Sequence, residues 1–532
     1  MRAVWGWTMR LALAGVAGLL LSEGYALRPW WWAPFVAPVP LILALGCWRG
    51  QAVAVGPAGF GAVGAGDVAA GRAAGVGPAV AVAVGVVAGA ASLVCVFGYY
   101  LAMAKWPGMA MIVPLRVLSW ALIAGLTSFA ARRLPLAGAM LVLPAAAAAL
   151  ELLTLVLSHD GAAGSLAYSQ GDRVAVEQVA ALGGVPAVVF VVLLPGSLAG
   201  LLLVRRWTRA QRRLALGLVA ALGAGVAGFA AVRLAPAPEG GIPVSLVATD
   251  RFRGISRDWD AVWAAYAPTV GQVARDGGLV VLPEKIALLD PAQAGRAAAS
   301  VSAVAVATGA SVVVGVEVQD GSVYRNRALA AEPDGRVLWY DKQRLVTGWE
   351  ARDVPGTKAL LLEAGGTRLG VAICKDMHIP SIGRAYDGAG VMAVPAWDFG
   401  RDGWMGARMT ALRAIENGYG IARSAREGLA GAYDADGRVI AEQTVGAGMT
   451  VVQAVLPVGR GATLYGRVGD GFGWLCVGGV AGLLVYAVWP RVRRVAATGF
   501  FRPVLRWRGP GGDRGGFSEA CEAVTNADRP GI

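Results

Sequence analysis

Histidine and charge are both scarce in this sequence. Only two histidines, His159 and His378, occur among 532 residues, and the five cysteines form no C-x-x-C pair. These absences exclude a zinc finger, a histidine-rich metal centre and a disulfide framework, so we expect neither a metal nor a cofactor. Charged residues make up 16% of the chain, against about a quarter in soluble domains. A wholly water-soluble globule is therefore not expected.

Long apolar runs take the place of the missing charge. Hydrophobic residues make up 56% of the chain, and a bilayer core is crossed by a helix of about 20 apolar residues. The sequence predicts eight membrane spans, at 7–23, 30–48, 75–101, 109–131, 135–157, 180–204, 213–234 and 472–490. The first run could also be the core of a signal peptide, but no convincing cleavage site follows it.

The positions of the arginines explain the net charge of +13. Basic clusters at 132–133, 205–213 and 491–494 follow alternate spans, and the loops between them hold fewer basic residues. This alternation follows the positive-inside rule and predicts a multi-pass protein of the inner membrane with cytoplasmic N- and C-termini. The segment after residue 234 is then extracytoplasmic. A nucleic-acid partner, the other common explanation of a basic chain, is not expected.

Residues 240–458 differ from the rest because short β-rich runs alternate with helical ones. Buried strands are predicted at VSLVA (244–248), LVVLP (279–283), SVVVGVEV (311–318), LGVAI (369–373) and VMAVP (391–395). Helices are predicted at 256–275 and 290–308. Asp334-Gly335 and Asp436-Gly437 predict the tight turns of hairpins.

These patterns together predict the architecture. We expect a polytopic α-helical membrane domain at 1–234, with seven spans, followed by an extracytoplasmic α/β domain at 240–458. An eighth membrane helix at 472–490 and a basic cytoplasmic tail at 491–532 complete the predicted chain.

Three residues of the α/β domain could carry acyl chemistry. Glu284 and Cys374 each follow a predicted strand, and Lys342 lies just after a turn. Catalytic groups of open α/β sheets gather at strand carboxyl ends, so these side chains could converge. A carboxylate can take a thiol proton and an ammonium can stabilise an oxyanion, so this trio could transfer acyl groups without histidine. A structural cysteine, a turn glutamate and a surface lysine remain the alternatives.

The motifs around these residues resemble a known family. LVVLPEK, YDKQRLVTGWE and VAICKD resemble the three signature regions of the nitrilase, or carbon–nitrogen hydrolase, superfamily. Seven spans before such a domain and one after it resemble the apolipoprotein N-acyltransferases, the membrane-bound branch of that superfamily. The resemblance implies a nitrilase-like αββα sandwich in which Glu284 is the general base, Lys342 the oxyanion stabiliser and Cys374 the nucleophile. It also implies that Glu350 holds Lys342 in place.

The sequence departs from the family pattern at two places. The family's nucleophile is usually followed by Tyr-Glu, whereas Lys375 and Asp376 follow it here. Asp376 can supply the carboxylate, and Lys375 can pair with Asp376 or meet a lipid phosphate. The usual V-Q-G-N run at the start of the domain is VATDRF, with Ala248 and Asp250. A divergent paralogue that acts on a different amine therefore stays open.

The resemblance also implies the substrates. A monomer would move an acyl chain from a membrane phospholipid, through a thioester on Cys374, to the α-amine of a diacylglyceryl-modified apolipoprotein. Trp349, Trp397 and Trp404, in predicted loops, could line an acyl tunnel or form a lid, and core packing is the alternative.

Two other functions stay open. One is a membrane-tethered amidase of the nitrilase type. The other is a non-catalytic lipid-binding or transport scaffold, because Arg116 and Glu151 lie within predicted spans, where charge often marks a transport path. These two residues could equally form a structural pair, and the intact Glu–Lys–Cys trio argues against a degenerate domain.

Overall fold

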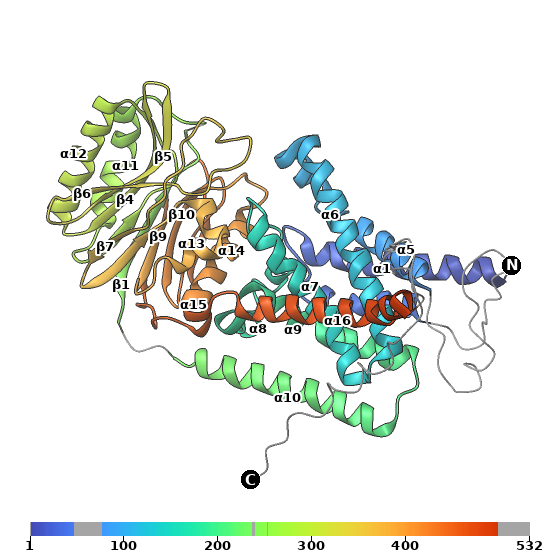
Figure 1. The fold of residues 1–532 in the computed structure, drawn as a ribbon. Helices are drawn as coiled ribbons and strands as arrows, with labels where there is room; N and C mark the ends of the chain where they lie inside the picture. Colours follow the sequence, from blue (N-terminus) through green and yellow to red (C-terminus); the bar gives the residue numbers. More distant parts are fainter. Residues whose placement is uncertain (1, 47–76, 237–239, 253, 498–532) are drawn as a thin grey trace, which may run out of the picture. The chain divides into compact units, whose positions relative to one another are not determined.

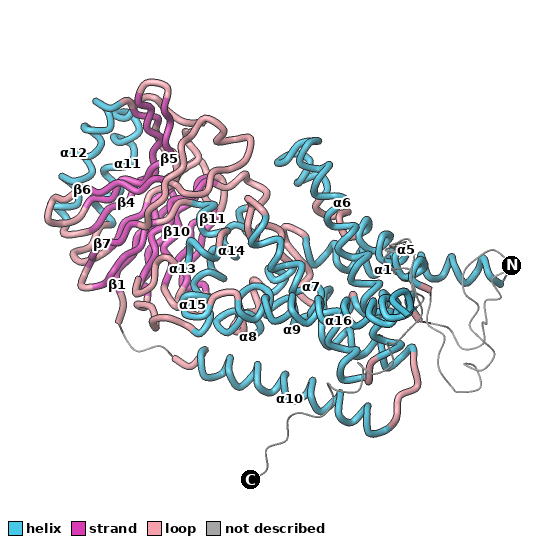
Figure 2. Tube along the Cα trace, viewed as in Figure 1, coloured by secondary structure: helices cyan, strands magenta, loops and turns pink. Residues whose placement is uncertain are grey.

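The computed structural model describes residues 2–46, 77–236, 240–252 and 254–497. Met1–Leu484 form one compact unit and Val485–Ile532 a second one. Within the larger unit, helices fill the first part of the chain and the strands follow from residue 242 to residue 456 (Figure 2). Most of the predicted tail, at 498–532, lies outside the described residues.

Helices make up the chain before the first strand (Figure 1). They are α1 (Arg2–Tyr25), α2 (Ala33–Val36), α3 (Pro38–Leu45), α5 (Pro78–Ala91), α6 (Phe97–Arg133), α7 (Leu136–Leu157), the 3₁₀ helix η1 (Leu166–Gln170), α8 (Val174–Glu177), α9 (Ala180–Val204) and α10 (Arg209–Arg233). In the described part of the chain, α6, α7, α9 and α10 are the four helices long and apolar enough to cross a membrane.

Two predicted spans are interrupted in the structure. The span predicted at 75–101 is divided, because α5 ends at Ala91 and α6 begins at Phe97. The Ser92 hydroxyl donates to the carbonyl of Gly89, a local bond that competes with helix continuation. The span predicted at 30–48 is divided at Pro38, which lacks the backbone N–H that would continue α2. Its last residues, 47–48, lie outside the described residues.

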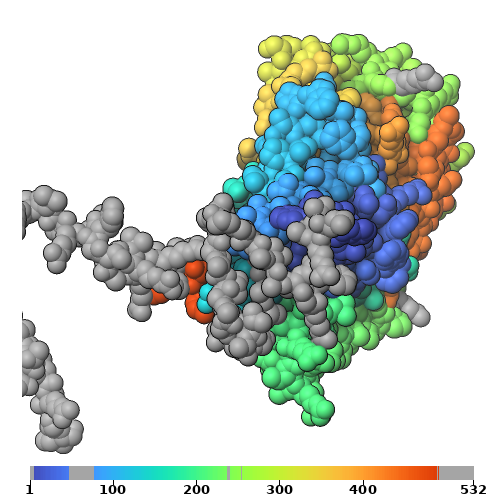
Figure 3. Space-filling view, turned by 90° about the vertical axis from the view of Figure 1, so that its right-hand side faces the viewer, coloured from blue at the N-terminus to red at the C-terminus, as the bar shows by residue number. Residues whose placement is uncertain are grey.

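Small residues allow the first helices to pack closely. A Cβ at Gly18 of α1 would lie 2.4 Å from the carbonyl oxygen of Ala88 in α5. A Cβ at Gly85 of α5 would lie 2.4 Å from the carbonyl oxygen of Trp120 in α6. The absence of a side chain at these two glycines therefore lets the backbones of neighbouring helices come close together. Figure 3 shows the surfaces of these helices, in dark to light blue, pressed together.

Two sheets form the α/β domain. The first runs in the order β13-β1-β2-β4-β5-β6, with β3 paired to β4, and the second runs in the order β12-β11-β10-β9-β8-β7. The strands of the first sheet are β1 (Ile242–Ala248), β2 (Leu279–Val281), β3 (Leu288–Leu289), β4 (Ser311–Asp320), β5 (Val323–Ala331), β6 (Val337–Asp341) and β13 (Thr450–Leu456). Those of the second are β7 (Leu360–Ala364), β8 (Thr367–Val371), β9 (Val391–Trp397), β10 (Gly420–Arg426), β11 (Leu429–Tyr433) and β12 (Val439–Thr444).

Four layers result, as Figure 1 shows. The two sheets pack face to face over a core that includes Leu246, Val313 and Val371. The other face of the first sheet is covered by α11 (Trp259–Val273) and α12 (Pro291–Thr308). The other face of the second is covered by α13 (Pro380–Arg384) and α14 (Gly403–Asn417). The predicted αββα sandwich is confirmed.

The first and last strands of this domain are neighbours. β1 and β13 pair antiparallel along seven residues, from Ile242 opposite Leu456 to Ala248 opposite Thr450. The chain therefore enters and leaves the sandwich at one edge region of the first sheet. After β13 follow α15 (Leu464–Val468) and α16 (Gly471–Ala497), and α16 covers the eighth predicted span.

Candidate active site

Glu284 is positioned by the turn that follows β2. Its backbone N–H donates to the carbonyl of Ala396, 3.2 Å away in β9 of the second sheet. Gly315 in β4 lets the neighbouring strand come close, because a Cβ there would lie 2.5 Å from Cα of Glu284. The carboxylate is thereby fixed between the two sheets and is almost fully buried.

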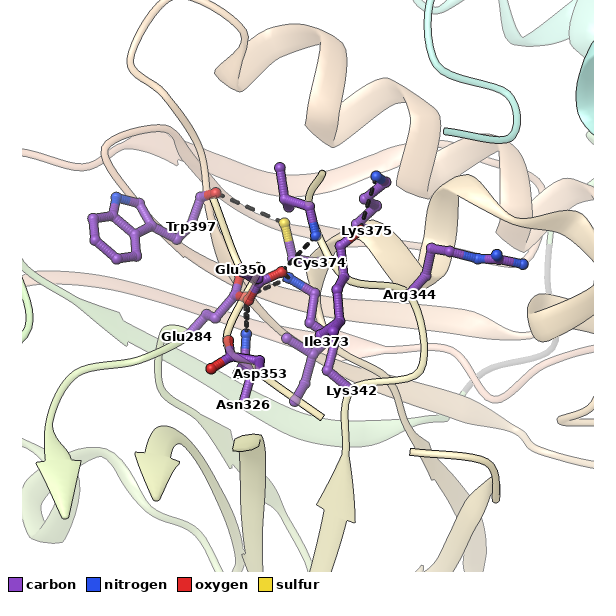
Figure 4. Close-up of polar contacts among 12 residues, drawn as sticks. Glu284, Asn326, Lys342, Arg344, Glu350, Asp353, Ile373, Cys374, Lys375 and Trp397 are labelled. Atoms are coloured by element: carbon purple, nitrogen blue, oxygen red, sulfur yellow. Dashed lines mark hydrogen bonds and ion pairs between the residues drawn. The ribbon is translucent and has the colours of Figure 1, made fainter. Parts of the chain in front are cut away.

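Lys342 follows β6 and reaches the same place. Its backbone N–H donates to the carbonyl of Asn326, 2.9 Å away in β5. Its Nζ donates to Oε1 of Glu284 at 2.7 Å and to Oε2 of Glu350 at 2.9 Å. The buried ammonium thus bridges two carboxylates, which Figure 4 shows converging on it.

Asn326 is a member of the cluster that the sequence reasoning missed. Its Nδ2 donates to Oε1 of Glu284 at 2.5 Å and to Oε1 of Glu350 at 2.6 Å. The amide therefore uses both N–H groups to hold the two carboxylates at a fixed separation. The available signal was an asparagine within the strand run VYRNRALAA, because asparagine is depleted in strands.

Cys374 begins the 3₁₀ helix η2 (Cys374–His378), just after β8. Its φ of 44° lies in the left-handed region, which costs free energy for any residue with a Cβ. Its Sγ lies 3.7 Å from the carbonyl oxygen of Trp397, and its side chain is partly exposed. Figure 4 shows the sulfur beside Glu284 and Lys342, so the structure brings the three predicted residues together.

The charges of the cluster are set by mutual contact. Burial opposes the charge of Lys342, but Glu284 and Glu350 outweigh this cost and hold the pKa of the lysine well above its ordinary value. Burial alone would raise the pKa of Glu350. The two lysines Lys342 and Lys285, with the backbone N–H of Val346, instead lower it to about 2. At neutral pH the cluster therefore holds a lysine cation between carboxylates.

The thiol of Cys374 is not ionised at rest. Burial and the neighbouring carboxylate of Glu284 raise its pKa above the ordinary value, and Lys342 offsets only part of that rise. A thiol with a raised pKa needs a base at the moment of attack, and Glu284 is the carboxylate next to it. The geometry can therefore support proton removal by Glu284 together with nucleophilic attack by sulfur.

Lys375 and Asp376 do not pair with each other, so that part of the sequence prediction is wrong. Lys375 Nζ lies 2.5 Å from Asp160 in the loop after α7 and donates to the carbonyl of Leu345 at 3.0 Å. The short helix η2 turns the two side chains to different partners, because the Asp376 carboxylate is taken up by backbone N–H groups and a tyrosine.

Asp376 supports the segment that carries Lys342. Its Oδ1 accepts from the backbone N–H groups of Gln343 and Arg344, at 3.0 and 2.7 Å. Its Oδ2 accepts from the Tyr340 hydroxyl at 2.7 Å and from the Ile373 N–H at 3.0 Å. Burial raises its pKa to about 6. This carboxylate therefore ties the lysine segment to the nucleophile segment.

The three tryptophans have different surroundings. Trp349 lies in a turn, is exposed, and packs its ring against Phe399. The prediction that Trp397 and Trp404 lie in loops is wrong, because Trp397 ends β9 and Trp404 belongs to α14. Trp397 continues the apolar run VMAVPAW of β9, and Trp404 lies in the first turn of α14. The Arg426 guanidinium lies 4.2 Å from the Trp397 ring centroid. Among the described residues, no group of histidine, cysteine and carboxylate side chains could hold a metal ion.

Comparison with known proteins supports the resemblance seen in the motifs. Residues 233–459 match the carbon-nitrogen hydrolase family. Over 140 residues the chain is 32% identical to the apolipoprotein N-acyltransferase of Geobacter metallireducens. That match covers 24% of this chain and 25% of the relative, so it spans about a quarter of the curated protein's length. These matches bear out the resemblance to the carbon–nitrogen hydrolase superfamily and, over 140 residues, to an apolipoprotein N-acyltransferase.

Two solved structures are also similar to part of this chain. An amidase from Nesterenkonia sp. is 22% identical, with a TM-score of 0.34, over 42% of this chain and 92% of that chain. A CN-hydrolase superfamily protein from Xanthomonas campestris is 21% identical, with a TM-score of 0.35, over 40% of this chain and 90% of that chain.

Proposed function

We propose that this protein is a membrane-bound N-acyltransferase that works through a thioester on Cys374. The observation that carries the proposal is the buried Lys342 ammonium, held between Glu284 and Glu350 beside the only cysteine of the α/β domain. The relative named apolipoprotein N-acyltransferase and the match to the carbon-nitrogen hydrolase family support it.

In the first step, Cys374 takes the acyl group from a phospholipid ester. Glu284 accepts the thiol proton while sulfur forms a bond to the carbonyl carbon. The carbonyl electrons move to oxygen, and Lys342 Nζ and a backbone N–H near Lys375 stabilise the resulting oxyanion. The intermediate then breaks its bond to the ester oxygen. That oxygen takes the proton from Glu284, and a lysophospholipid leaves.

In the second step, an amine receives the acyl group. The α-amine of the diacylglyceryl-modified cysteine of an apolipoprotein attacks the thioester carbon and gives a proton to Glu284. The carbon–sulfur bond breaks, the sulfur of Cys374 recovers that proton, and an amide remains on the acceptor. Glu284 therefore ends each cycle as a carboxylate.

Both substrates carry acyl chains, which favours a site next to the membrane. Each buried CH₂ group contributes about 0.8 kcal/mol, and four helices of the described chain are apolar and long enough to cross a bilayer. We place the α/β domain on the extracytoplasmic side of the inner membrane, as the arginine distribution predicts. We propose that the active form is a monomer and that both of its termini lie in the cytoplasm.

Trapping the thioester tests the proposal. The purified full chain is incubated with a phospholipid that carries labelled acyl chains, and the label is followed by mass spectrometry of the Cys374 peptide. We expect a label that neutral hydroxylamine removes, and we expect its absence in Cys374→Ala. An enzyme that turns over while Cys374 never carries the label would refute the covalent route.

Amide hydrolysis is the second candidate. The family model that matches residues 233–459 is described as a carbon-nitrogen hydrolase, and the same thioester could be opened by water. Release of ammonia from a soluble amide, together with no transfer from phospholipid to an amine, would favour this reaction over acyl transfer. A phospholipid-derived amide on a lipopeptide acceptor would exclude it as the main reaction.

A further inference from the structure

We propose that Lys285, the residue after Glu284, is a positioning residue that aligns the Glu350–Lys342 pair for attack by Cys374. This inference rests on the proposed function, because it assigns Lys285 a task in the same reaction. Lys285 is almost fully buried, and its ammonium contacts three carboxylates. Nζ lies 3.0 Å from Glu317, 3.0 Å from Glu350 and 2.7 Å from Asp353.

The backbone at Lys285 is strained in a way that serves these contacts. Its φ of 50° is left-handed, and only four residues other than glycine have a positive φ in the described chain. Cys374 is another of the four. The unusual conformation lets consecutive side chains contact different partners, because Glu284 meets Lys342 whereas Lys285 meets Glu317 and Asp353. Such strain persists where neighbouring contacts hold it, and it is concentrated at functional sites.

The contacts of Glu350 explain how Lys285 can reach the chemistry. Oε1 of Glu350 accepts from Asn326 at 2.6 Å and meets Lys285 at 3.0 Å. Oε2 accepts from the Val346 N–H at 2.7 Å and from Lys342 at 2.9 Å. Oε1 thus has one hydrogen-bond donor and one ion-pair partner, and Oε2 has two donors, so the plane of the carboxylate is fixed. Loss of Lys285 frees one side of Glu350, and its hold on Lys342 loosens.

Charge alternates along the resulting row of side chains. Lys285 is a cation, Glu350 an anion, Lys342 a cation and Glu284 an anion, with successive contacts of 3.0, 2.9 and 2.7 Å. Beyond Lys285 lie Glu317 of β4 and Asp353, and the Arg352 guanidinium stands 3.5 Å from Glu317. Without Lys285, three carboxylates would face one another, and the pKa of Glu350 would rise.

Stability alone is a poor explanation for this lysine. A buried ion pair is often no more stabilising than apolar residues of similar volume. Burial also raises the pKa of Glu317 even though Lys285 is next to it. The ion pairs of Lys285 therefore keep fixed charges close to the reacting groups. Such charges are useful where a proton must move between Cys374 and Glu284.

The test measures activation of Cys374 directly, without either lipid substrate. The full chain in detergent is treated with iodoacetamide from pH 5 to pH 9, and alkylation of Cys374 is timed by mass spectrometry. In Lys285→Met we expect a rate about tenfold lower at pH 7 and an acid limb shifted upward by about one pH unit. Lys285→Arg should recover part of the rate, because it restores the cation. Arg352→Met, which removes a cation that reaches Glu317 but not Glu350, should stay within about twofold of the unaltered chain.

A double variant separates positioning from folding. Lys285→Met/Glu317→Gln removes one charge of each sign, so it should recover thermal stability while the alkylation rate stays low. Recovery of the rate together with the melting temperature would overturn the inference. So would a Lys285→Met protein with the unaltered rate and pH profile.

Failure of the proposed function gives a different result. If Glu284→Gln alkylates at the same rate as the unaltered chain, Glu284 is not the base for Cys374, and both proposals are refuted. If Glu284→Gln is slow and Lys285→Met is not, only the role of Lys285 is refuted.

Discussion

Four protein groups surround the buried carboxylate of Glu350. Two lysines, an amide and a backbone N–H share its two oxygens. Its side chain is 6% exposed, so solvent screens these contacts little. Such a group links the proton concentration to the stability of the fold, since its ionised form is bound far more tightly than its neutral form.

The pH dependence of stability should therefore depend on Glu350. Its folded pKa is about 2 and its ordinary value is 4.5. A lowered pKa contributes stability that is fully present above pH 4.5 and is lost as the pH falls toward 2. The contribution is on the order of 3 kcal/mol at neutral pH, at about 1.4 kcal/mol per pKa unit. Thermal unfolding between pH 7 and pH 3 should show Glu350→Gln well below the unaltered chain at pH 7.

The two proteins should converge as the pH falls. A difference between them that is the same at pH 7 and pH 3 would contradict the assignment. Glu363→Gln is the matched control, because that carboxylate is exposed and its nearest cation, Arg368, lies 3.9 Å away. We expect it to change stability by less than about 0.5 kcal/mol at any pH.

Asn326 gives a sharper prediction at the level of one atom. Asn326→Asp replaces an amide that donates to Glu284 and Glu350 with a third carboxylate. Repulsion should push the carboxylates apart and weaken their hold on Lys342, with a loss of acyl transfer of about 100-fold or more. Acyl-enzyme formation from labelled phospholipid measures this loss. Asn326→Asp with more than half of the original rate would show that the bridge does not matter.

For single residues, the sequence predicted the members of the cluster that lie in recognisable motifs. Glu284, Lys342, Cys374 and Glu350 were predicted to act together because each lies at a fixed place in a family signature, and the structure places their side chains in one cluster. Asn326 was not predicted, because its role depends on strand β5 running beside the turn after β2, which no local pattern encodes. The partners of Lys285 are spread over residues 317–353 and have the same limitation.

Among the elements, the segment after β6 depends most on a neighbour. Residues 343–350 contain no helix or strand, and the Asp376 carboxylate ties the start of this segment to η2 through Gln343 and Arg344. Four hydrogen-bond donors converge on the Asp376 carboxylate. Each of them needs an acceptor, and an N–H group in place of a carboxylate oxygen cannot provide one.

Asp376→Asn should therefore release this segment. The new amide N–H₂ must face two of the four donors, either the two backbone N–H groups of the segment or those of Tyr340 and Ile373. We expect iodoacetamide labelling of Cys374 to slow at least tenfold, because unpaired buried donors cost about 1–3 kcal/mol each. Faster proteolysis within 343–350 is expected as well. Unchanged cleavage and unchanged labelling would show that the segment holds its place without Asp376.

Strand and helix predictions succeeded where the pattern was local. The five apolar runs became β1, β2, β4, β8 and β9, and the two helices became α11 and α12. Both Asp-Gly turns join antiparallel strands, β5 with β6 and β11 with β12. The strands that were missed include β7, which alternates exposed with less exposed residues, and β12, in which no residue is buried, and each carries a glutamate. Edge strands of this kind look like loops in a sequence.

For the molecule as a whole, polar contacts join the helical part to the sandwich. Lys375, beside the nucleophile, reaches Asp160 in the loop after α7. Arg408 of α14 reaches Asp172 near α8 and Glu442 of β12. The Val185 N–H of α9 donates to the Glu416 carboxylate of α14. None of these long-range pairs could be read from sequence spacing.

The Lys375–Asp160 pair should show energetic coupling. Asp160 is 55% exposed and Lys375 only 5%, so removal of Asp160 leaves a buried ammonium with one carbonyl partner. We expect Asp160→Ala to lower the melting temperature by about 1 °C, and Lys375→Met/Asp160→Ala to recover most of that loss. A double-mutant cycle measured by thermal unfolding should give a coupling of about 1 kcal/mol, since solvent screens the exposed partner. Strictly additive effects would contradict the pair.

The pairing of β1 with β13 bears on how such a chain can be rebuilt. Ile242 and Leu456 are opposite one another in the sheet, about 5 Å apart as antiparallel neighbours are. Although the domain has more than two hundred residues, the helices before and after it are joined across a distance as short as that of a hairpin loop. Because the folded domain itself holds these two ends together, joining the flanking helices costs little additional chain entropy. The α/β domain can therefore be treated as an insertion whose two ends are adjacent. A catalytic domain with similarly close ends could be inserted at the same two positions.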